Sequence, residues 1–328
     1  MPPASQAALT HAQLSAIDRW IAAGSPSAPD PSCAGNSISN DDGEVAKFEW
    51  PADCEEFYTF TAGQGTPHLV PANSETHPAF YFDVPWGGQG PVQALATRPI
   101  TDNKRVLHHW ILNQGESNFL TGWAPGGTSA VSPDGVGIYL PDSGQMKLDM
   151  HYYNVGNDRD ELDESGVEIC ITRTLRPMTS TVYPFAASAT VPAGQRVTNQ
   201  NTCTVQSTEP VYLIGSSPHM HQLGVHAKLE ILRQDGSVEV VHDKPFSFDD
   251  QRAVTLDPIE LNNGDQVRTT CVYQNDTTQN VTFGTGSYDE MCFNFAMYYP
   301  MCAMKCTGGD VVAWFLSLAQ GGGCPSGG

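Results

Sequence analysis

Beyond its first fifty residues, the chain is built from short stretches in which apolar and polar residues alternate, separated by Gly, Pro, Asn and Asp. Alternation with a period of two buries one face of an extended strand, and the separating residues are those that turns require. Many short strands with frequent turns favour antiparallel sheets packed face to face. We therefore predict an all-β fold. The stretches include Phe80–Val84, Val106–Leu112, Met146–Tyr153, Val211–Ile214, Gln266–Tyr273 and Phe293–Tyr299.

Two further features divide the chain into three parts. Between residues 9 and 24, a capping box at Thr10 and Gln13 precedes apolar residues at helical spacing. Residues 25–45 have the composition of a linker, and a break with two prolines lies near residues 176–188. We predict a short N-terminal helix and linker, followed by two antiparallel β-sandwich, jelly-roll-like domains. The predicted boundaries are 1–45, 46–176 and 177–328.

The balance of charges excludes some partners. The sequence has 36 acidic and 16 basic residues, for a formal net charge of −20. Such a surface repels phosphate, so we predict no nucleic-acid partner. No stretch of 18 apolar residues occurs, so we predict no membrane span. Residues 1–8 lack the basic and apolar pattern of a signal peptide.

Nine cysteines are many for a chain of 328 residues from a reducing compartment. They form no Cys-x-x-Cys pair, and the nearest approach is Cys302 with Cys306. Scattered cysteines favour disulfides over a zinc site and predict a secreted or periplasmic protein. Reduced core cysteines are the alternative. An odd number leaves at least one thiol without a partner inside the chain.

His219 and His221 flank Met220 and form the clearest candidate metal-binding pattern. Residues i and i+2 of a strand face the same side, so both imidazoles can reach one ion. Gly215 and Pro218 before them suggest a bend that could open the site. The alternative is a pair of surface histidines.

His108 and His109 form a second pair. Neighbours on a regular strand point to opposite faces, so both bind one ion only if the backbone is irregular or the rings reach round through Nδ1. Otherwise one is buried and one exposed. His151 shares a strand face with Lys147 and Asp149, and that face is either solvent or a polar cleft.

The ligand types favour copper. No Asp or Glu stands at close spacing beside the histidine pairs, which disfavours carboxylate-assisted iron and zinc sites. Imidazoles with a thioether suit copper that cycles between Cu(I) and Cu(II). Periodicity does not single out one of the nine methionines. We interpret His226 as a solvated strand residue and assign no role to His11, His68, His77 and His242.

Four motifs occur in order along residues 75–306. They are Val106-Leu107-His108-His109-Trp110, Leu148-Asp149-Met150-His151-Tyr152-Tyr153, His219-Met220-His221-Gln222-Leu223-Gly224 and Asp289-Glu290-Met291-Cys292. Together they resemble the copper type II, ascorbate-dependent monooxygenases, which include peptidylglycine α-hydroxylating monooxygenase and dopamine β-monooxygenase. The resemblance implies two copper ions, one on each of two β-sandwich domains, with a solvent-filled cleft between them.

The resemblance also implies residue roles. The ligands of an electron-transfer copper would be His108, His109 and His151. The ligands of an oxygen-binding copper would be His219, His221 and Met291. As an alternative, Met291 alternates with Phe293, Phe295 and Met297, as a core residue would. Ascorbate or another one-electron donor would supply electrons.

Disulfides are implied as well. Cys271 and Cys292 occupy family positions that bracket the loop with Met291, and Cys203 would pair with Cys306 or Cys302. The family's disulfide in the first domain is missing, because Ala79 and Glu164 occupy both positions. We make no prediction for Cys33, Cys54, Cys170 and Cys324.

Departures from the family bear on the substrate. Ser217, Phe293 and Phe295 stand where the peptide-amidating enzyme has the Arg, Asn and Tyr that hold a substrate carboxylate. We therefore expect no peptide substrate. Trp110 replaces a methionine that is not a ligand. Trp110, Phe293 and Phe295 suggest an apolar or aromatic pocket, with core packing as the alternative for each.

The predicted function is hydroxylation of a C–H bond of a small molecule with O2. The alternative is a non-catalytic copper-binding or electron-transfer protein on the same scaffold. Residues 1–24 are similar to the C-terminal end of a small cytochrome c domain but lack Cys-x-x-Cys-His. A cytochrome c-type electron donor is therefore a candidate partner, and the alternative is that the segment is a plain docking helix.

Overall fold

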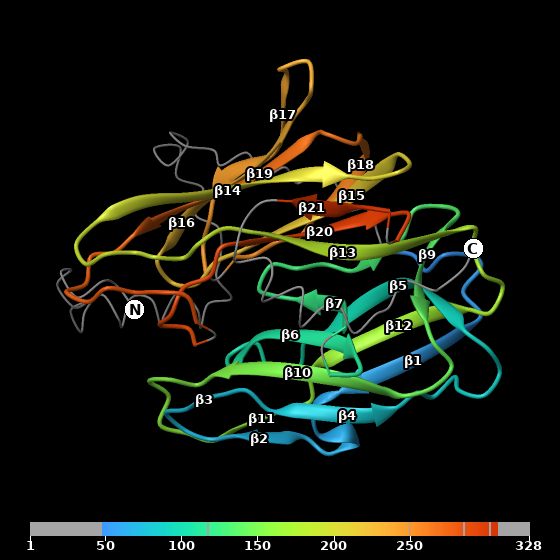
Figure 1. Ribbon diagram of the computed structural model, residues 1–328. Coiled ribbons are helices and arrows are strands. Elements are labelled where there is room, and N and C mark those ends of the chain that lie inside the picture. The colour runs from blue at the N-terminus through green and yellow to red at the C-terminus, as the bar shows by residue number, and fades with distance from the viewer. Residues whose placement is uncertain (1–47, 117, 249, 285, 302, 308–328) are drawn as a thin grey trace, which may run out of the picture. The chain divides into compact units, whose positions relative to one another are not determined.

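The computed structural model describes residues 48–116, 118–248, 250–284, 286–301 and 303–307 (Figure 1). The chain divides into two compact units, Met1–Glu49 and Trp50–Gly328, and nearly all described residues belong to the second. The predicted N-terminal helix, its linker and the segment compared with cytochrome c lie outside the described residues.

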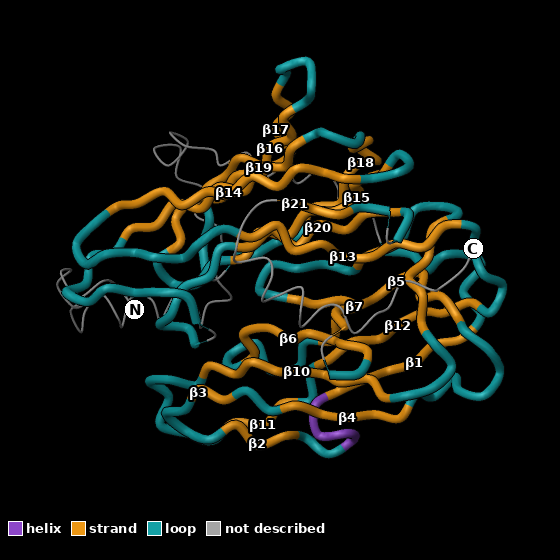
Figure 2. Tube along the Cα trace, in the orientation of Figure 1, coloured by secondary structure: helices purple, strands orange, loops and turns teal. Residues whose placement is uncertain are grey.

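The described residues form strands joined by turns and loops, which confirms the all-β prediction (Figure 2). One short 3₁₀ turn, η2, spans Ala62–Gly65. Within the described part of the chain, no helix has the length and apolar character that crossing a bilayer requires.

The first sandwich consists of two sheets from strands β1 to β12. One layer has the order β1-β12-β5-β9, with β8 beside β5. Its strands are β1 (Glu56–Thr61), β5 (Val92–Ile100), β8 (Ala130–Val131), β9 (Val136–Leu140) and β12 (Gly166–Thr172). The other has the order β3-β10-β6-β7, with β4 beside β10. Its strands are β3 (Glu75–Thr76), β4 (Ala79–Asp83), β6 (Leu107–Gln114), β7 (Asn118–Trp123) and β10 (Gln145–Tyr153). A separate pair joins β2 (His68–Val70) to β11 (Glu161–Asp163).

A core of alternating residues fills this sandwich. Leu148 and Met150 of β10 and Leu112 of β6 meet Val167 and Ile169 of β12. All five side chains are at most 2% exposed. Removing apolar surface of this kind from water stabilises the fold by about 25 cal/mol per Å². The sequence period of two therefore correctly identified the inward face of β10.

The second sandwich is formed by strands β13 to β21. One layer has the order β13-β20-β15-β18 and the other β17-β16-β19-β14-β21. The strands of the first layer are β13 (Met178–Ala186), β15 (Val211–His219), β18 (Val254–Leu261) and β20 (Phe293–Tyr299). Those of the second are β14 (Arg196–Gln206), β16 (Gly224–Leu232), β17 (Val238–Pro245), β19 (Gln266–Gln274) and β21 (Lys305–Thr307). Their core includes Phe185, Leu213, Leu229, Val267 and Phe293.

The two sets of strands share one sheet. Residues 178–180 of β13 pair in parallel with residues 136–138 of β9, which makes a continuous nine-stranded sheet. Figure 1 shows β9 running beside β13 at this junction. The Arg176 guanidinium donates to the Pro133 and Val136 carbonyls next to it, at 3.0 and 2.7 Å. The sheets are thus not purely antiparallel, and the predicted boundary at residues 176 and 177 stays a prediction.

Candidate metal centre

An irregularity in β6 brings His108 and His109 to one side. His151 of β10 lies opposite His109, but the next residue, Tyr152, lies opposite Leu107. His108 is therefore an extra residue in β6, and such a bulge re-aims side chains. The sequence analysis required an irregular backbone if His108 and His109 were to bind one ion. The structure shows that irregularity.

Three ring nitrogens meet at this bulge. His108 Nδ1 lies 3.0 Å from His109 Nδ1 and 3.3 Å from His151 Nδ1. Nitrogens bound to one ion at about 2.0–2.1 Å lie about 3.3–3.6 Å apart. The first histidine group (His108, His109 and His151) therefore fits a single metal ion held by three Nδ1 atoms.

An acceptor selects the ligating nitrogen of His151. Its Nε2 lies 2.8 Å from Glu75 Oε1, and the carboxylate can only accept a hydrogen bond when it is ionised. Nε2 therefore carries the proton, and Nδ1 presents its lone pair. Of the two alternatives for the strand face that His151 shares with Lys147 and Asp149, the structure favours a polar site over solvent at His151, because His151 is only 3% exposed.

The first histidine group is uncharged at neutral pH. Burial, followed by the positive charge that His151 would carry, lowers the pKa of His108 to about 3. Burial, followed by His77, lowers the pKa of His151 to about 4, although Glu75 opposes the shift. Burial also lowers the pKa of His109 well below its usual value. Neutral imidazoles are the form that binds metal ions.

The second histidine pair, His219 and His221, lies where β15 ends. His219 is the last residue of β15, and His221 follows it outside the strand. The two rings are 5.3 Å apart between centroids and nearly perpendicular. The prediction that both histidines lie on one regular strand is therefore wrong for His221, although the rings remain neighbours.

Each ring of this pair has an acceptor at Nδ1. His219 Nδ1 donates to Gln251 Oε1 at 2.7 Å, and His221 Nδ1 donates to the Asp289 carbonyl at 3.1 Å. Both Nε2 atoms therefore keep their lone pairs. Burial, followed by His221, lowers the pKa of His219 to about 3. The pair presents two neutral nitrogen donors.

Met291 precedes β20 beside the second core. It is partly buried against that core, and its carbonyl accepts a hydrogen bond from Tyr273 Oη at 2.8 Å. The neighbouring Cys292 forms a disulfide with Cys271, as expected. The role of the Met291 sulfur as a ligand stays a prediction.

Glu290 connects the segment that carries Met291 to the second histidine pair. Its buried carboxylate accepts the backbone N–H groups of His221 at 3.0 Å and of Leu223 at 2.7 Å. It also accepts the N–H of Met291 at 3.2 Å. Burial raises the pKa of Glu290 to about 7, against the effect of these hydrogen bonds.

The two sets of histidines lie close together. The His109 and His219 rings are 6.0 Å apart between centroids. Phe248 stacks on His108 at 4.0 Å and lies 6.4 Å from the His221 ring. Phe248 thus packs between rings of the two sets, and the solvent-filled cleft implied by the resemblance stays a prediction.

Sequence reasoning missed several residues around the histidines. Glu75, Gln251 and Glu290 orient the histidines or their backbone, and His77 stacks on His151 at 4.2 Å. Glu75, His77 and His151 also bring three potential ligand atoms together. Only Glu290 carried a sequence signal, because it precedes Met291 within a motif. The others come from distant segments with no distinctive spacing.

The three aromatic residues suggested for a pocket have different positions. Trp110 and Phe293 are each 1% exposed within the two cores, so both are core residues. Phe295 stacks on Phe119 of β7 at 5.6 Å and lies 6.0 Å from the His219 ring. The Phe295 ring thus lies beside a predicted ligand, and the residue is only partly buried against the second core.

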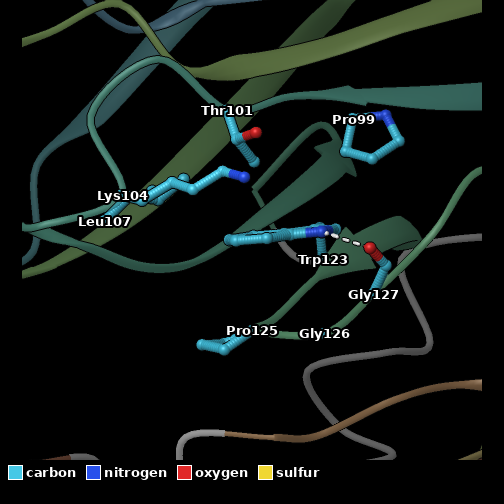
Figure 3. Close-up of a pocket in the computed structure, with 8 residues that line it drawn as sticks. All are labelled: Pro99, Thr101, Lys104, Leu107, Trp123, Pro125, Gly126 and Gly127. Atoms are coloured by element: carbon cyan, nitrogen blue, oxygen red, sulfur yellow. Dashed lines mark hydrogen bonds between the residues drawn. The ribbon is translucent and has the colours of Figure 1, made fainter. Parts of the chain in front are cut away.

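A pocket of about 290 Å³ lies among residues of β5, β6, β7 and the loops beside them (Figure 3). Leu107, which precedes His108, forms part of its wall. Figure 3 shows Lys104 and Thr101 above the Trp123 ring, whose Nε1 donates to the Gly127 carbonyl at 2.9 Å. None of the six predicted ligands lines this pocket.

Further cysteines are paired. Cys54 and Cys170, for which the sequence supported no prediction, form a disulfide that joins β12 to the segment before β1. Cys203 is also disulfide-bonded, whereas the side chains of Cys302 and Cys306 lie outside the description. Disulfides agree with the oxidising compartment inferred from the cysteine pattern.

Comparisons with known proteins support the motif-based interpretation. Dopamine beta-hydroxylase of Rattus norvegicus is 27% identical over 204 residues, covering 57% of this chain and 33% of that protein. Tyramine beta-hydroxylase of Caenorhabditis briggsae is 28% identical over 200 residues, covering 56% of this chain and 34% of that protein. DBH-like monooxygenase protein 2 of Mus musculus is 28% identical over 204 residues, covering 56% and 33%.

The matched region spans about a third of the length of these relatives. The crystal structure of the STIV MCP aligns with 75% of this chain and 98% of that chain at 9% identity and a TM-score of 0.31. No comparison supports the cytochrome c-type partner. A family model also matches residues 178–311. The family model describes the C-terminal domain of copper type II, ascorbate-dependent monooxygenases, so these residues are similar to that domain, and the match supports the resemblance that the sequence motifs indicated.

Proposed function

We propose that this protein is a copper-dependent monooxygenase that hydroxylates a C–H bond of a small, apolar or aromatic molecule. It would use O2 and ascorbate or another one-electron donor. The main support is the convergence of three neutral Nδ1 donors beside a second pair with free Nε2 atoms. The disulfides support a secreted or periplasmic location.

The chain's own residues would prepare two nitrogen-rich copper sites. Bound copper would supply the one-electron steps and the activation of O2 that side chains cannot provide. Glu75, Gln251 and the Asp289 carbonyl fix which nitrogen of each histidine faces the metal. Because these acceptors lie on three separate segments, they also restrict rotation of the rings.

The surroundings of His219 support an apolar or aromatic substrate. Phe295 and Phe119 stack beside this ring with an interplanar angle of 5°. Apolar walls with few polar groups are typical of small-molecule sites. Two relatives carry the names of dopamine and tyramine hydroxylases, so we extend small aromatic substrates to this chain as part of the proposal.

The first test is a substrate screen. Copper-loaded protein with ascorbate and ¹⁸O2 would be incubated with small aromatic compounds, including phenylethylamines and their uncharged analogues. We expect a product that gains one ¹⁸O atom, and loss of that product in His108→Ala and His219→Ala. Reductant oxidation without any oxygenated product would instead favour a copper-binding electron carrier.

The electron carrier is the second candidate function. It is favoured by the 6.0 Å separation of the His109 and His219 rings, which provides a short path between the two sets of histidines. The test is to measure the rates at which a partner protein reduces and reoxidises the copper, with and without O2. Equal rates under the two conditions would identify an electron carrier.

Glycine-extended peptides test the substrate class. We expect poor turnover, because Ser217, Phe293 and Phe295 provide no cation for a terminal carboxylate. A charge-assisted hydrogen bond contributes about 1.5–3 kcal/mol, so the lost affinity is roughly tenfold or more per contact. The measurement is kcat/KM for a glycine-extended peptide against the matching uncharged amide. Equal or higher values for the acid would contradict the assignment.

A further inference from the structure

One carboxylate lies between the first histidine group and the segment before Met291. Glu75 Oε1 accepts a hydrogen bond from His151 Nε2 at 2.8 Å. The same oxygen accepts from Ser287 Oγ at 2.6 Å and from Ser287 N–H at 3.2 Å. Glu75 lies on β3, whereas Ser287 lies between β19 and β20, 212 residues further along. His151 and Ser287 are 3% and 1% exposed.

We propose that Glu75 is a positioning residue that sets the ligating nitrogen of His151 and couples copper binding there to the order of the Ser287–Met291 segment. This inference rests on the proposed function in one respect, namely that the first histidine group binds copper. It requires no particular substrate.

Glu75 would act on His151 by favouring one tautomer. A neutral imidazole carries one N–H, and an acceptor at Nε2 leaves the Nδ1 lone pair free. Without Glu75, the proton could move to Nδ1, where His108 Nδ1 lies 3.3 Å away as an alternative acceptor. That internal hydrogen bond would use the lone pair that copper needs. Glu75 therefore keeps the first histidine group ready for the metal.

The coupling follows from what lies on each side of Ser287. Next to it, Tyr288 Oη lies 3.2 Å from Tyr153 Oη of β10. Two residues after Ser287, the Asp289 carbonyl accepts the Nδ1 proton of His221 at 3.1 Å. A shift of His151 on copper binding is thus transmitted through Glu75 and Ser287 to the carbonyl that orients His221.

A second use of the same residues is a competing outcome. Glu75, His77 and His151 have potential ligand atoms within 4.8 Å of one another, so they could hold an ion of their own. The hydrogen bond between Glu75 and His151 favours the positioning role, because an ion bound there would occupy Nε2. Counting metal ions separates the two roles, because an ion held by Glu75 would be bound in addition to the ion of the first histidine group.

The test uses the full chain in a His219→Ala background, which removes the second site. Copper affinity would be measured by competition with a Cu(I) chelator in Glu75→Ala, Glu75→Gln and Ser287→Ala. Glu168→Ala is the matched control, because Glu168 pairs with Arg98 on the neighbouring strand of another sheet. Hydrogen exchange of the peptide covering residues 286–291 would be followed with and without copper.

We expect Glu75→Ala to weaken copper binding by about 10–100-fold, the usual effect of losing a residue that orients a metal ligand. Glu75→Gln retains an acceptor oxygen and should stay within about threefold of the parent, as should Glu168→Ala. Ser287→Ala leaves the Glu75–His151 bond in place, so its copper affinity should change little. It should lose the copper-dependent protection of residues 286–291 that the parent shows.

Three results would overturn the inference: unchanged copper affinity in Glu75→Ala, equal protection of residues 286–291 in Ser287→Ala, or a second ion in the His219→Ala parent that is lost with Glu75. Failure of the proposed function looks different. The parent would then bind no copper at the first histidine group, or it would bind copper without forming any oxygenated product.

Discussion

At the scale of single residues, the five predicted histidine ligands differ in the nitrogen atom that faces the metal. His108, His109 and His151 present Nδ1 to the first group, whereas His219 and His221 use Nδ1 for hydrogen bonds and keep the Nε2 lone pair. A ligand imidazole is oriented by what its other nitrogen contacts. Substitutions at Glu75 or Gln251 should therefore change metal binding without touching a ligand.

Met291→Leu distinguishes a ligand from a core residue. The change nearly conserves volume, so it should cost less than about 1.5 kcal/mol of unfolding free energy. As a ligand, Met291 also supplies a thioether that leucine lacks, so hydroxylation should fall by orders of magnitude while the first copper remains bound. Thermal unfolding, copper analysis and single-turnover product formation are the measurements. Unchanged turnover would leave Met291 a core residue.

At the scale of elements, alternation predicted the strands and their inward faces correctly. The apolar side of β10, with Leu148 and Met150, is buried as expected. Alternation does not predict what covers the other face of β10, which carries His151, because the covering residues Glu75 and Phe248 come from other segments. The bulge at His108 was also beyond prediction, since it depends on pairing register between β6 and β10.

Gly126 tests the loop that carries Phe248 and Gln251. This loop is anchored by Gln251 N–H, which donates to the Pro125 carbonyl at 2.9 Å. Gly126 has φ of 84°, and an added Cβ would overlap Asp250 Oδ1 and lie 2.9 Å from Arg252 Cγ. Gly126→Ala should therefore move the Asp250 and Arg252 side chains on either side of Gln251, weaken copper binding at His219 and speed hydrogen exchange in the loop.

Gly144→Ala is the control for backbone strain. Gly144 has φ of 101°, and nothing lies within 4 Å of an added Cβ. Both substitutions incur the cost of a positive φ, about 1 kcal/mol, but only Gly126→Ala adds a collision. Equal copper affinities in the two variants would show that loop docking does not orient His219.

The two described disulfides should differ in their effects. Cys54–Cys170 closes 116 residues and Cys271–Cys292 closes 21. Chain entropy predicts stabilisation of about 4.9 and 3.3 kcal/mol respectively. Replacing Cys54 and Cys170 together by serine should therefore lower stability more.

Replacing Cys271 and Cys292 should lower hydroxylation more, because Cys292 adjoins Met291. Denaturant unfolding and product assays of the two double-serine variants test both halves of this prediction. A larger loss of activity from the Cys54–Cys170 pair would contradict the role assigned to the second disulfide.

At the scale of the whole molecule, histidines far apart in the sequence become neighbours, with the aromatic ring of Phe248 packed between them. Six predicted ligands could be named from motifs, because their types and order were distinctive. Their contacts could not, since His109 meets His219 only after both sandwiches form and share the sheet through β9 and β13. This closeness makes the number of copper ions the decisive quantity.

Copper counting tests the central claim most directly. Full-length protein, its His108→Ala variant and its His219→Ala variant would be saturated with copper, separated from free metal and analysed for copper per chain. X-ray absorption would report the ligands of each ion. We predict two coppers in the parent and one in each variant, with a sulfur ligand retained in His108→Ala. One copper in the parent, lost in both variants, would show that both sets of histidines hold a single ion and would contradict the account.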